Sequence, residues 1–173
     1  GGSCFPKDTR ALIDTGNKFK TDLSIVKSVI NSNENRKTLL IKRVDNIFGG
    51  NFKNKIITFL GVTFKPNTDD MREASSISMI KYLNKKSCKI KYYDPSGEKD
   101  DFKSLKNVNY CATITSACLN ADMVILHTEW NDFKLLNFKK LVKKQKFKIY
   151  DMRNMYSPSR MKKLNIDYYG VGR

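Results

Sequence analysis

The chain has 173 residues, 40% hydrophobic and 11% aromatic, a composition typical of a globular protein with one good-sized domain, alone or with an appended helical arm. No stretch approaches the roughly 18 uncharged apolar residues that a membrane-spanning helix needs, so no membrane span is predicted. The formal net charge of +16 would suit a nucleic-acid-binding protein. The lysines are scattered over polar helical positions without a recognised motif, however, which favours a solvated lysine-rich surface.

Four cysteines, Cys4, Cys88, Cys111 and Cys118, show no CxxC spacing and form no zinc pattern with the single histidine, His127. No metal site is therefore predicted, and free thiols of this kind indicate a reducing, cytoplasmic location. The sequence opens inside a motif rather than with Met, from which we expect an N-terminal part outside it.

Residues 4–48 predict helices, because apolar residues recur at helical spacing over 23–30 and again over 39–48. Residues 31–33 form only a weak break, which a long helix can run through. Residues 49–51 (GGN) are a clear stop. We therefore expect a helical segment over residues 1–50 and a separate domain over residues 51–173.

From residue 56 onward, short apolar runs alternate with helical patterns. Strands are predicted over 56–62, 89–94, 123–126, 147–151 and 166–169, and helices over 74–83, 116–121, 133–143 and 159–164. This alternation predicts an α/β fold, in which the helical segment is followed by a doubly wound, mostly parallel Rossmann-like sheet. No glycine-rich dinucleotide fingerprint follows any strand, so this sheet is not expected to carry a dinucleotide site of its own.

Ligands of such sheets bind outside the carboxyl ends of the strands. Charged, aromatic and hydrogen-bonding residues follow the predicted strands at these ends: Phe64 and Lys65, Asp94, His127 to Trp130, and Asp151 to Asn154. Parallel strands bring these residues to one edge of the sheet.

The first eight residues (GGSCFPKD) place a cysteine between paired glycines and an expected helix start marked by Pro6. Small residues allow close approach to a ligand, and the positive helix end with Lys7 favours the thiolate of Cys4. That is the environment of a nucleophile. The alternative is a small buried hydrophobic residue at a turn.

These eight residues resemble the catalytic-cysteine segment of the UDP-glucose/GDP-mannose dehydrogenase family, and within it the UDP-glucose 6-dehydrogenases. Residues 61–74 (GVTFKPNTDDMREA) resemble the signature after the first strand of the family's C-terminal, UDP-sugar-binding domain. Residues 128–130 (TEW) and 151–154 (DMRN) resemble two later signatures. The resemblance covers essentially the whole chain, while the family's N-terminal NAD-binding domain is absent from it.

The resemblance implies oxidation of UDP-glucose to UDP-glucuronate, for polysaccharide biosynthesis, with NAD as cofactor in two hydride transfers. Cys4 would hold the substrate as thiohemiacetal and then thioester, which keeps the reactive aldehyde on the enzyme. Asp8, one helical turn away, would activate the hydrolytic water. Together with Cys4, the residues Phe5, Pro6 and Lys7 would lie against the NAD.

Five further assignments follow from the resemblance. Gly1, Phe64, Lys65 and Arg153 would bind the sugar nucleotide, and Arg72 would reach the NAD of the missing domain. Cationic side chains at strand ends suit a diphosphate, which arginine can bind bidentately.

The resemblance also implies partners. The missing N-terminal half would complete the enzyme, so the chain alone is expected to be inactive. The central helix would form a homodimer, with Val26, Ile30 and Leu40 facing the partner subunit.

Each assignment has a simpler alternative. Four polar side chains could have a local role instead of binding or catalysis: Asp8 as a helix cap, Lys65 as a solvated loop residue, Arg72 paired with Asp69 or Asp70, and Arg153 paired with Asp151. Trp130 and His127 could be packing residues. For the chain as a whole the alternatives are a non-catalytic sugar-nucleotide-binding module or truncated relic, a dehydrogenase for another sugar nucleotide such as GDP-mannose, and a nucleic-acid-binding domain. Phe5 after the cysteine favours UDP-glucose over GDP-mannose.

Overall fold

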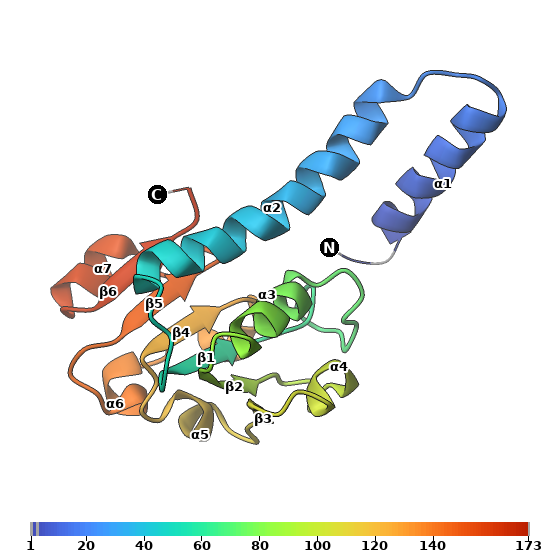
Figure 1. The fold of residues 1–173 in the computed structure, drawn as a ribbon. Coiled ribbons are helices and arrows are strands. Elements are labelled where there is room, and N and C mark those ends of the chain that lie inside the picture. Colours follow the sequence, from blue (N-terminus) through green and yellow to red (C-terminus); the bar gives the residue numbers. More distant parts are fainter. Residues whose placement is uncertain (1, 3, 173) are drawn as a thin grey trace.

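The computed structural model describes residues 2 and 4–172, which form a helical hairpin followed by an α/β part (Figure 1). The hairpin consists of α1 (Cys4–Lys18) and α2 (Ser24–Phe48). The strands are β1 (Ile56–Leu60), β2 (Lys89–Tyr93), β3 (Val108–Tyr110), β4 (Met123–Leu126), β5 (Lys148–Asp151) and β6 (Asp167–Gly170). The remaining helices are α3 (Ser75–Asn84), α4 (Asp100–Lys103), α5 (Ile114–Cys118), the 3-10 turn η1 (Asn131–Phe133), α6 (Phe138–Val142) and α7 (Pro158–Lys163).

The six strands form one sheet in the order β3-β2-β1-β4-β5-β6, and every neighbouring pair is parallel. The chain starts at the centre with β1, moves outward through β2 and β3, and then returns to build β4, β5 and β6 on the other side. The direction of winding therefore switches between β1 and β4, where open α/β sheets bind ligands. The predicted doubly wound Rossmann-like sheet is confirmed.

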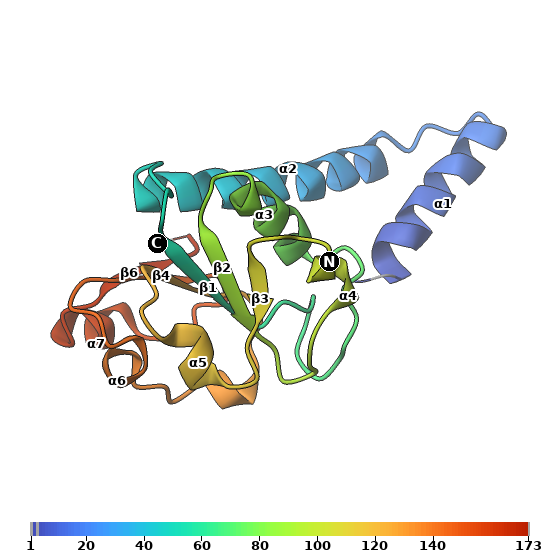
Figure 2. The same cartoon turned by 60° about the horizontal axis from the view of Figure 1, so that its bottom comes forward.

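Helices cover both faces of the sheet, with α2 and α3 on one face and α5, α6 and α7 on the other (Figure 2). Alternate residues of each central strand enter different cores. In β4, Met123 and Ile125 pack toward α2 and α3, whereas Val124 and Leu126 pack toward α5 and α6. This burial on both faces explains why the central strands are continuous apolar runs.

Two elements, α4 and β3, were not predicted from the sequence. Strand β3 has only three residues and lies at the edge of the sheet, half exposed, so it lacks the apolar run of a central strand. The single helix predicted over 133–143 is wrong. Phe133 is the last residue of η1, and the only α-helix in this stretch is α6. It starts late because the Asn137 side chain accepts a hydrogen bond from the Lys140 backbone N–H and caps the helix there.

The helical hairpin turns at residues 19–23 rather than at the weak break over 31–33, which α2 runs through. Leu23 packs tightly on Gly16, where an added Cβ would lie 2.5 Å from Leu23 Cδ1. The predicted stop is confirmed, since Gly49 ends α2 in the left-handed conformation. Leu40 packs against the protein's own core, which corrects the expectation that it faces a partner subunit. Within the described residues, no helix is both long and apolar enough to cross a membrane.

Four charged residues, hereafter the ion cluster, tie the hairpin to the α/β part: Arg10, Glu34, Lys37 and Glu73. The Glu73 carboxylate, just before α3, accepts hydrogen bonds from Lys37 Nζ at 2.6 Å and from Arg10 Nη1 at 3.1 Å. Glu34 pairs with the same two cations, at 3.1 Å from Lys37 and 3.7 Å from Arg10. The backbone of Glu73 is in the left-handed conformation, with φ of 58°.

We predict that Glu73→Gln lowers the free energy of unfolding by about 1–2 kcal/mol at pH 7, measured by urea denaturation. Hydrogen bonds from Lys37 and then Arg10 lower the pKa of Glu73. Its contribution to stability is therefore present above the pKa of an unfolded glutamate and is lost as the pH falls through the lower folded pKa. The difference in the free energy of unfolding between the wild-type protein and Glu73→Gln should therefore become smaller at acid pH. An equal effect of Glu98→Gln, at an exposed position, would contradict this account.

Gly61, directly after β1, lies against Thr128, which follows β4. Its φ is +75°, and an added Cβ would lie 2.5 Å from Thr128 Cβ and 3.1 Å from Thr128 Cα. The chains that leave β1 and β4 can approach this closely at the switch of winding only because residue 61 has no side chain.

Gly61→Ala should therefore lower the free energy of unfolding by about 3 kcal/mol, from backbone strain and from the clash with Thr128. The matched control is Gly97→Ala, because Gly97 also has a positive φ, +91°, but no heavy atom within 4 Å of an added Cβ. The control should cost only about 1 kcal/mol. Equal shifts of the urea midpoint in the two variants would show that the contact with Thr128 is unimportant.

Candidate functional site

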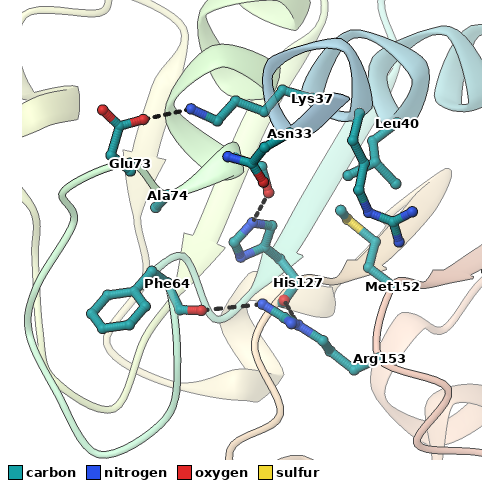
Figure 3. Close-up of a pocket in the computed structure, with 11 residues that line it drawn as sticks. Asn33, Lys37, Leu40, Phe64, Glu73, Ala74, His127, Met152 and Arg153 are labelled. Carbon is teal, nitrogen blue, oxygen red and sulfur yellow. Dashed lines mark hydrogen bonds and ion pairs between the residues drawn. The ribbon is translucent and has the colours of Figure 1, made fainter. Parts of the chain in front are cut away.

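A cavity of about 140 Å³ lies at the carboxyl ends of β1, β4 and β5, beneath α2 (Figure 3). Its position matches the switch of winding between β1 and β4. Side chains from α2, from the loop after β1 and from the other strand ends line it: Asn33, Arg36, Lys37, Leu40, Phe64, Glu73, Ala74, Ser75, His127, Met152 and Arg153. Three of these residues are cationic, so the cavity suits an anionic ligand that also carries hydrogen-bonding groups.

Arg153, which follows β5, joins the ends of three strands. Its Nε donates to the His127 carbonyl at 2.7 Å, and its Nη2 donates to the Phe64 carbonyl at 3.2 Å. The guanidinium also forms an ion pair with Glu129 at 2.9 Å. The alternative of a side-chain pair with Asp151 is not seen, because Asp151 Oδ1 accepts instead from the Arg153 backbone N–H, at 3.0 Å.

His127 is fully buried and forms one wall of the cavity. Its Nε2 lies 2.9 Å from Ser75 Oγ, and its Nδ1 lies 3.1 Å from Thr128 Oγ1. Burial, with a smaller contribution from Arg153, lowers the pKa of His127 to about 3, so the ring is neutral at physiological pH. Trp130 is buried in the core beside α5 and α6, in agreement with a packing role.

The loop after β1 presents Phe64 and Lys65 at this edge. Asp94, after β2, orders the loop by accepting from the Val62 backbone N–H at 2.8 Å. Phe64 lines the cavity, and its ring packs on Gly2, where an added Cβ would lie 3.0 Å from the ring. Lys65 is exposed and does not line the cavity; its Nζ lies 5.4 Å from the centroid of the Phe64 ring.

Arg72 pairs with Asp70, as one of the sequence-based alternatives has it. Its Nε lies 3.0 Å from Asp70 Oδ1 and its Nη2 lies 2.9 Å from Asp70 Oδ2, a bidentate arrangement. These hydrogen bonds lower the pKa of Asp70. The guanidinium remains exposed, so it is accessible to a ligand.

Cys4 is the first residue of α1 and is exposed. Burial raises the pKa of Cys88 to about 11 and that of Cys118 to about 12. Cys4 lies near Lys7 and Arg72: after the dominant interactions with Asp8 and Asp70, its charge contributes to raising the pKa of both cations. Pro6 is the third helical residue rather than the first, still within the first turn that tolerates proline.

Asp8 is exposed and forms an ion pair with Lys7 at 2.9 Å. It lies beyond the first turn of α1, which excludes the alternative of a helix cap. Phe5 is also exposed, with 69% of its surface accessible. Gly1, a predicted substrate contact, lies outside the described residues. Among residues 2 and 4–172, no three His, Cys, Asp or Glu side chains gather to hold a metal ion.

The structure thus brings Phe64 and Arg153 together at the cavity and places Cys4 near Arg72. Lys65 and Asp8 stand outside the cavity. Sequence reasoning did not identify Arg36, Lys37 and Ser75 as cavity residues. Ser75, at a helix start, and the two cations, on a helix predicted as a separate segment, carried no signal that linked them to the sheet edge.

Known protein families match most of the chain. Residues 58–158 match the model of the UDP-glucose/GDP-mannose dehydrogenase family, UDP binding domain, and residues 1–35 match the central domain of the same family. A UDP-glucose 6-dehydrogenase of Rickettsia felis is 38% identical over 99% of this chain and 39% of its own length. The UDP-glucose 6-dehydrogenase YwqF of Bacillus subtilis is 38% identical over 100% of this chain and 40% of its own length.

Solved structures share the fold. An NDP-N-acetyl-D-galactosaminuronic acid dehydrogenase from Methanosarcina mazei superposes with a TM-score of 0.82 at 21% identity, covering 100% of this chain and 38% of that one. A UDP-glucose dehydrogenase from Pyrobaculum islandicum gives a TM-score of 0.73 at 27% identity, covering 87% and 34%. The chain spans about 40% of the length of the curated relatives named above. Since the UDP-binding-domain model matches more than half of its residues, the chain belongs to the UDP-glucose/GDP-mannose dehydrogenase family.

Proposed function

We propose that the chain is the C-terminal portion of an NAD-dependent UDP-glucose 6-dehydrogenase, which oxidises UDP-glucose to UDP-glucuronate. The observation that carries the proposal is the cation-lined cavity at the switch of winding, whose lining includes Phe64 and Arg153. The identity of 38% to UDP-glucose 6-dehydrogenases supports the choice of substrate. In this proposal residues 1–50 form the catalytic-cysteine segment, residues 51–173 bind the UDP-sugar, and the protein works in the cytoplasm.

Substrate binding is assigned to Gly1, Phe64, Lys65 and Arg153. The Arg153 side chain is held at the cavity by two backbone carbonyls, so little conformational entropy remains to be lost on binding a phosphate. Lys65, whose Nζ lies 5.4 Å from the centroid of the Phe64 ring, can add a second cation to a diphosphate that extends out of the cavity.

The cofactor is assigned to the exposed surface around α1. Two molecules of NAD, bound in turn, would each accept one hydride removed from C6 of the glucose unit. Cys4, Phe5, Pro6 and Lys7 would face its nicotinamide end, and the exposed guanidinium of Arg72 suits one of its phosphates. The described part of the chain has no glycine-rich phosphate loop, so the rest of the cofactor would be held by the N-terminal half of the enzyme.

Covalent catalysis is assigned to Cys4. Its thiolate would add to the C6 aldehyde to give a thiohemiacetal, which becomes a thioester when the second hydride leaves. Asp8 would then take a proton from water as the water attacks the thioester, releasing the carboxylate product and the Cys4 thiol. Asp8 is exposed and lies 2.9 Å from Lys7 Nζ, so water can reach its carboxyl group.

A homodimer is part of the same proposal. Three large apolar side chains of α2 are exposed, namely Ile25 (80%), Val29 (47%) and Leu39 (62%). A partner subunit on this helix would bury them.

A non-catalytic sugar-nucleotide-binding module is the second candidate. One observation favours it: neither Cys4 nor Asp8 is among the residues that line the cavity. Such a module would bind UDP-glucose without using its thiol.

We predict saturable binding of UDP-glucose to this chain by calorimetry, weakened about tenfold or more by Arg153→Ala and several-fold by Lys65→Ala, because each removes a cation from the phosphates. Arg160→Ala, at an exposed position on α7, is the matched control and should bind normally. Circular dichroism establishes that each variant is folded. Equal affinity in all four proteins would argue against a UDP-glucose site at this edge.

Limited alkylation with iodoacetamide should modify Cys4 first, because its thiol is exposed whereas Cys88 and Cys118 are buried with raised pKa values. Peptide mass spectrometry identifies the modified residue. Cys4→Ser should remove the fast phase of alkylation and leave the slow modification of the buried cysteines. If Cys88 or Cys118 reacted as fast as Cys4, the assignment of Cys4 as the accessible nucleophile would fail.

A further inference from the structure

The hydrogen bonds around His127 determine which of its ring nitrogens carries the proton. Thr128 Oγ1 donates its only hydrogen to the Thr63 carbonyl, at 2.6 Å, since a carbonyl can only accept. Toward His127 Nδ1, at 3.1 Å, the same hydroxyl can therefore act only as an acceptor. The proton of the ring must lie on Nδ1.

A neutral imidazole carries one ring proton, so Nε2 of His127 is a bare acceptor. The neutral form is favoured here because the ring is fully buried beside the Arg153 guanidinium. Ser75 Oγ, at 2.9 Å from Nε2, is consequently the donor in that hydrogen bond. The single hydroxyl proton of Ser75 is thereby committed to His127.

Ser75 thus presents only lone pairs to the cavity it lines. Most polar groups around it have the opposite character, because Arg36, Lys37 and Arg153 can only donate. Glu73 also lines the cavity, but its carboxylate already accepts from Lys37 and Arg10. Figure 3 shows His127 between the α2 side of the cavity and Arg153. Ser75 is therefore a hydrogen-bond acceptor surrounded by cations, and it has no hydrogen left to donate to a phosphate oxygen.

We propose that Ser75 is a specificity-determining residue that accepts a hydrogen bond from one hydroxyl group of the bound sugar nucleotide, and that His127 is the positioning residue that fixes the direction of the Ser75 hydroxyl. The inference rests on the proposed binding of UDP-glucose. The phosphate oxygens of the ligand bind the cations, and a hydroxyl group of its sugar or ribose donates a hydrogen bond to Ser75.

The first test concerns the protein alone. His127 is the only histidine of the chain, so a ¹⁵N-histidine-labelled sample reports on this ring without assignment. We expect the neutral tautomer with the proton on Nδ1, and we expect Ser75→Ala to shift the Nε2 signal by removing its donor. A proton on Nε2 at neutral pH would overturn the inference.

The second test measures binding of UDP-glucose analogues in which one hydroxyl at a time, on the glucose or the ribose, is replaced by fluorine. Fluorine cannot donate, so one analogue should bind about five- to tenfold more weakly than UDP-glucose. This discrimination should vanish in Ser75→Ala, persist in Ser75→Thr, which keeps a hydroxyl, and persist in Ser78→Ala, one turn away on α3.

The outcomes separate the two proposals. Normal binding of UDP-glucose with no analogue discriminated, or with discrimination retained in Ser75→Ala, would overturn the role of Ser75 alone. Failure of UDP-glucose to bind to the folded chain would overturn the proposed function and, with it, the ligand assigned to Ser75. Discrimination lost only in Ser75→Ala, together with the Nδ1 proton, would support both.

Discussion

The hydrogen bond from Thr128 Oγ1 to the Thr63 carbonyl, at 2.6 Å, joins the chain leaving β1 to the chain leaving β4 at the point where the winding of the sheet reverses. Much of the candidate site depends on it. The contact requires Gly61, whose missing Cβ makes room for Thr128. It also sets the polarity of His127 and, through it, of Ser75. One hydrogen bond between two loops thus fixes the donor and acceptor roles of the side chains in the cavity.

Charge is distributed in a way that the net value of +16 conceals. Within the ion cluster, two carboxylates balance two cations, so this part of the cavity wall adds no net charge. Arg153 is likewise paired with Glu129, which leaves Arg36 as the cavity cation for which no ion pair is seen among residues 2 and 4–172. A diphosphate entering the cavity would therefore compete with existing ion pairs.

The central sheet was predictable because its strands are buried on both faces. Strand β4 is four consecutive apolar residues and was predicted with its observed bounds, whereas the half-exposed edge strand β3 carries no such signal. The rule that ligands bind at strand ends led to Phe64, His127 and Arg153. It could not lead to Arg36 and Lys37, because only the packing of α2 over the sheet edge brings them there, and charged residues on a helix are usually solvated. The direction of the His127 hydrogen bonds likewise depends on partners far apart in the sequence.

Helix α2 packs on the core of the α/β part only over its C-terminal portion, and the rest of the helix extends away from the sheet. Its 25 residues span about 37 Å, from the sheet at one end to the turn that leads back to α1 at the other. A tilt of about 3° at the sheet would move the far end by about 2 Å. Near its middle, the helix is attached to the α/β part by the ion pair between Lys37 and Glu73, a contact that dissolved salt weakens. Dissolved salt would therefore weaken the attachment of the cysteine-bearing hairpin to the sheet edge.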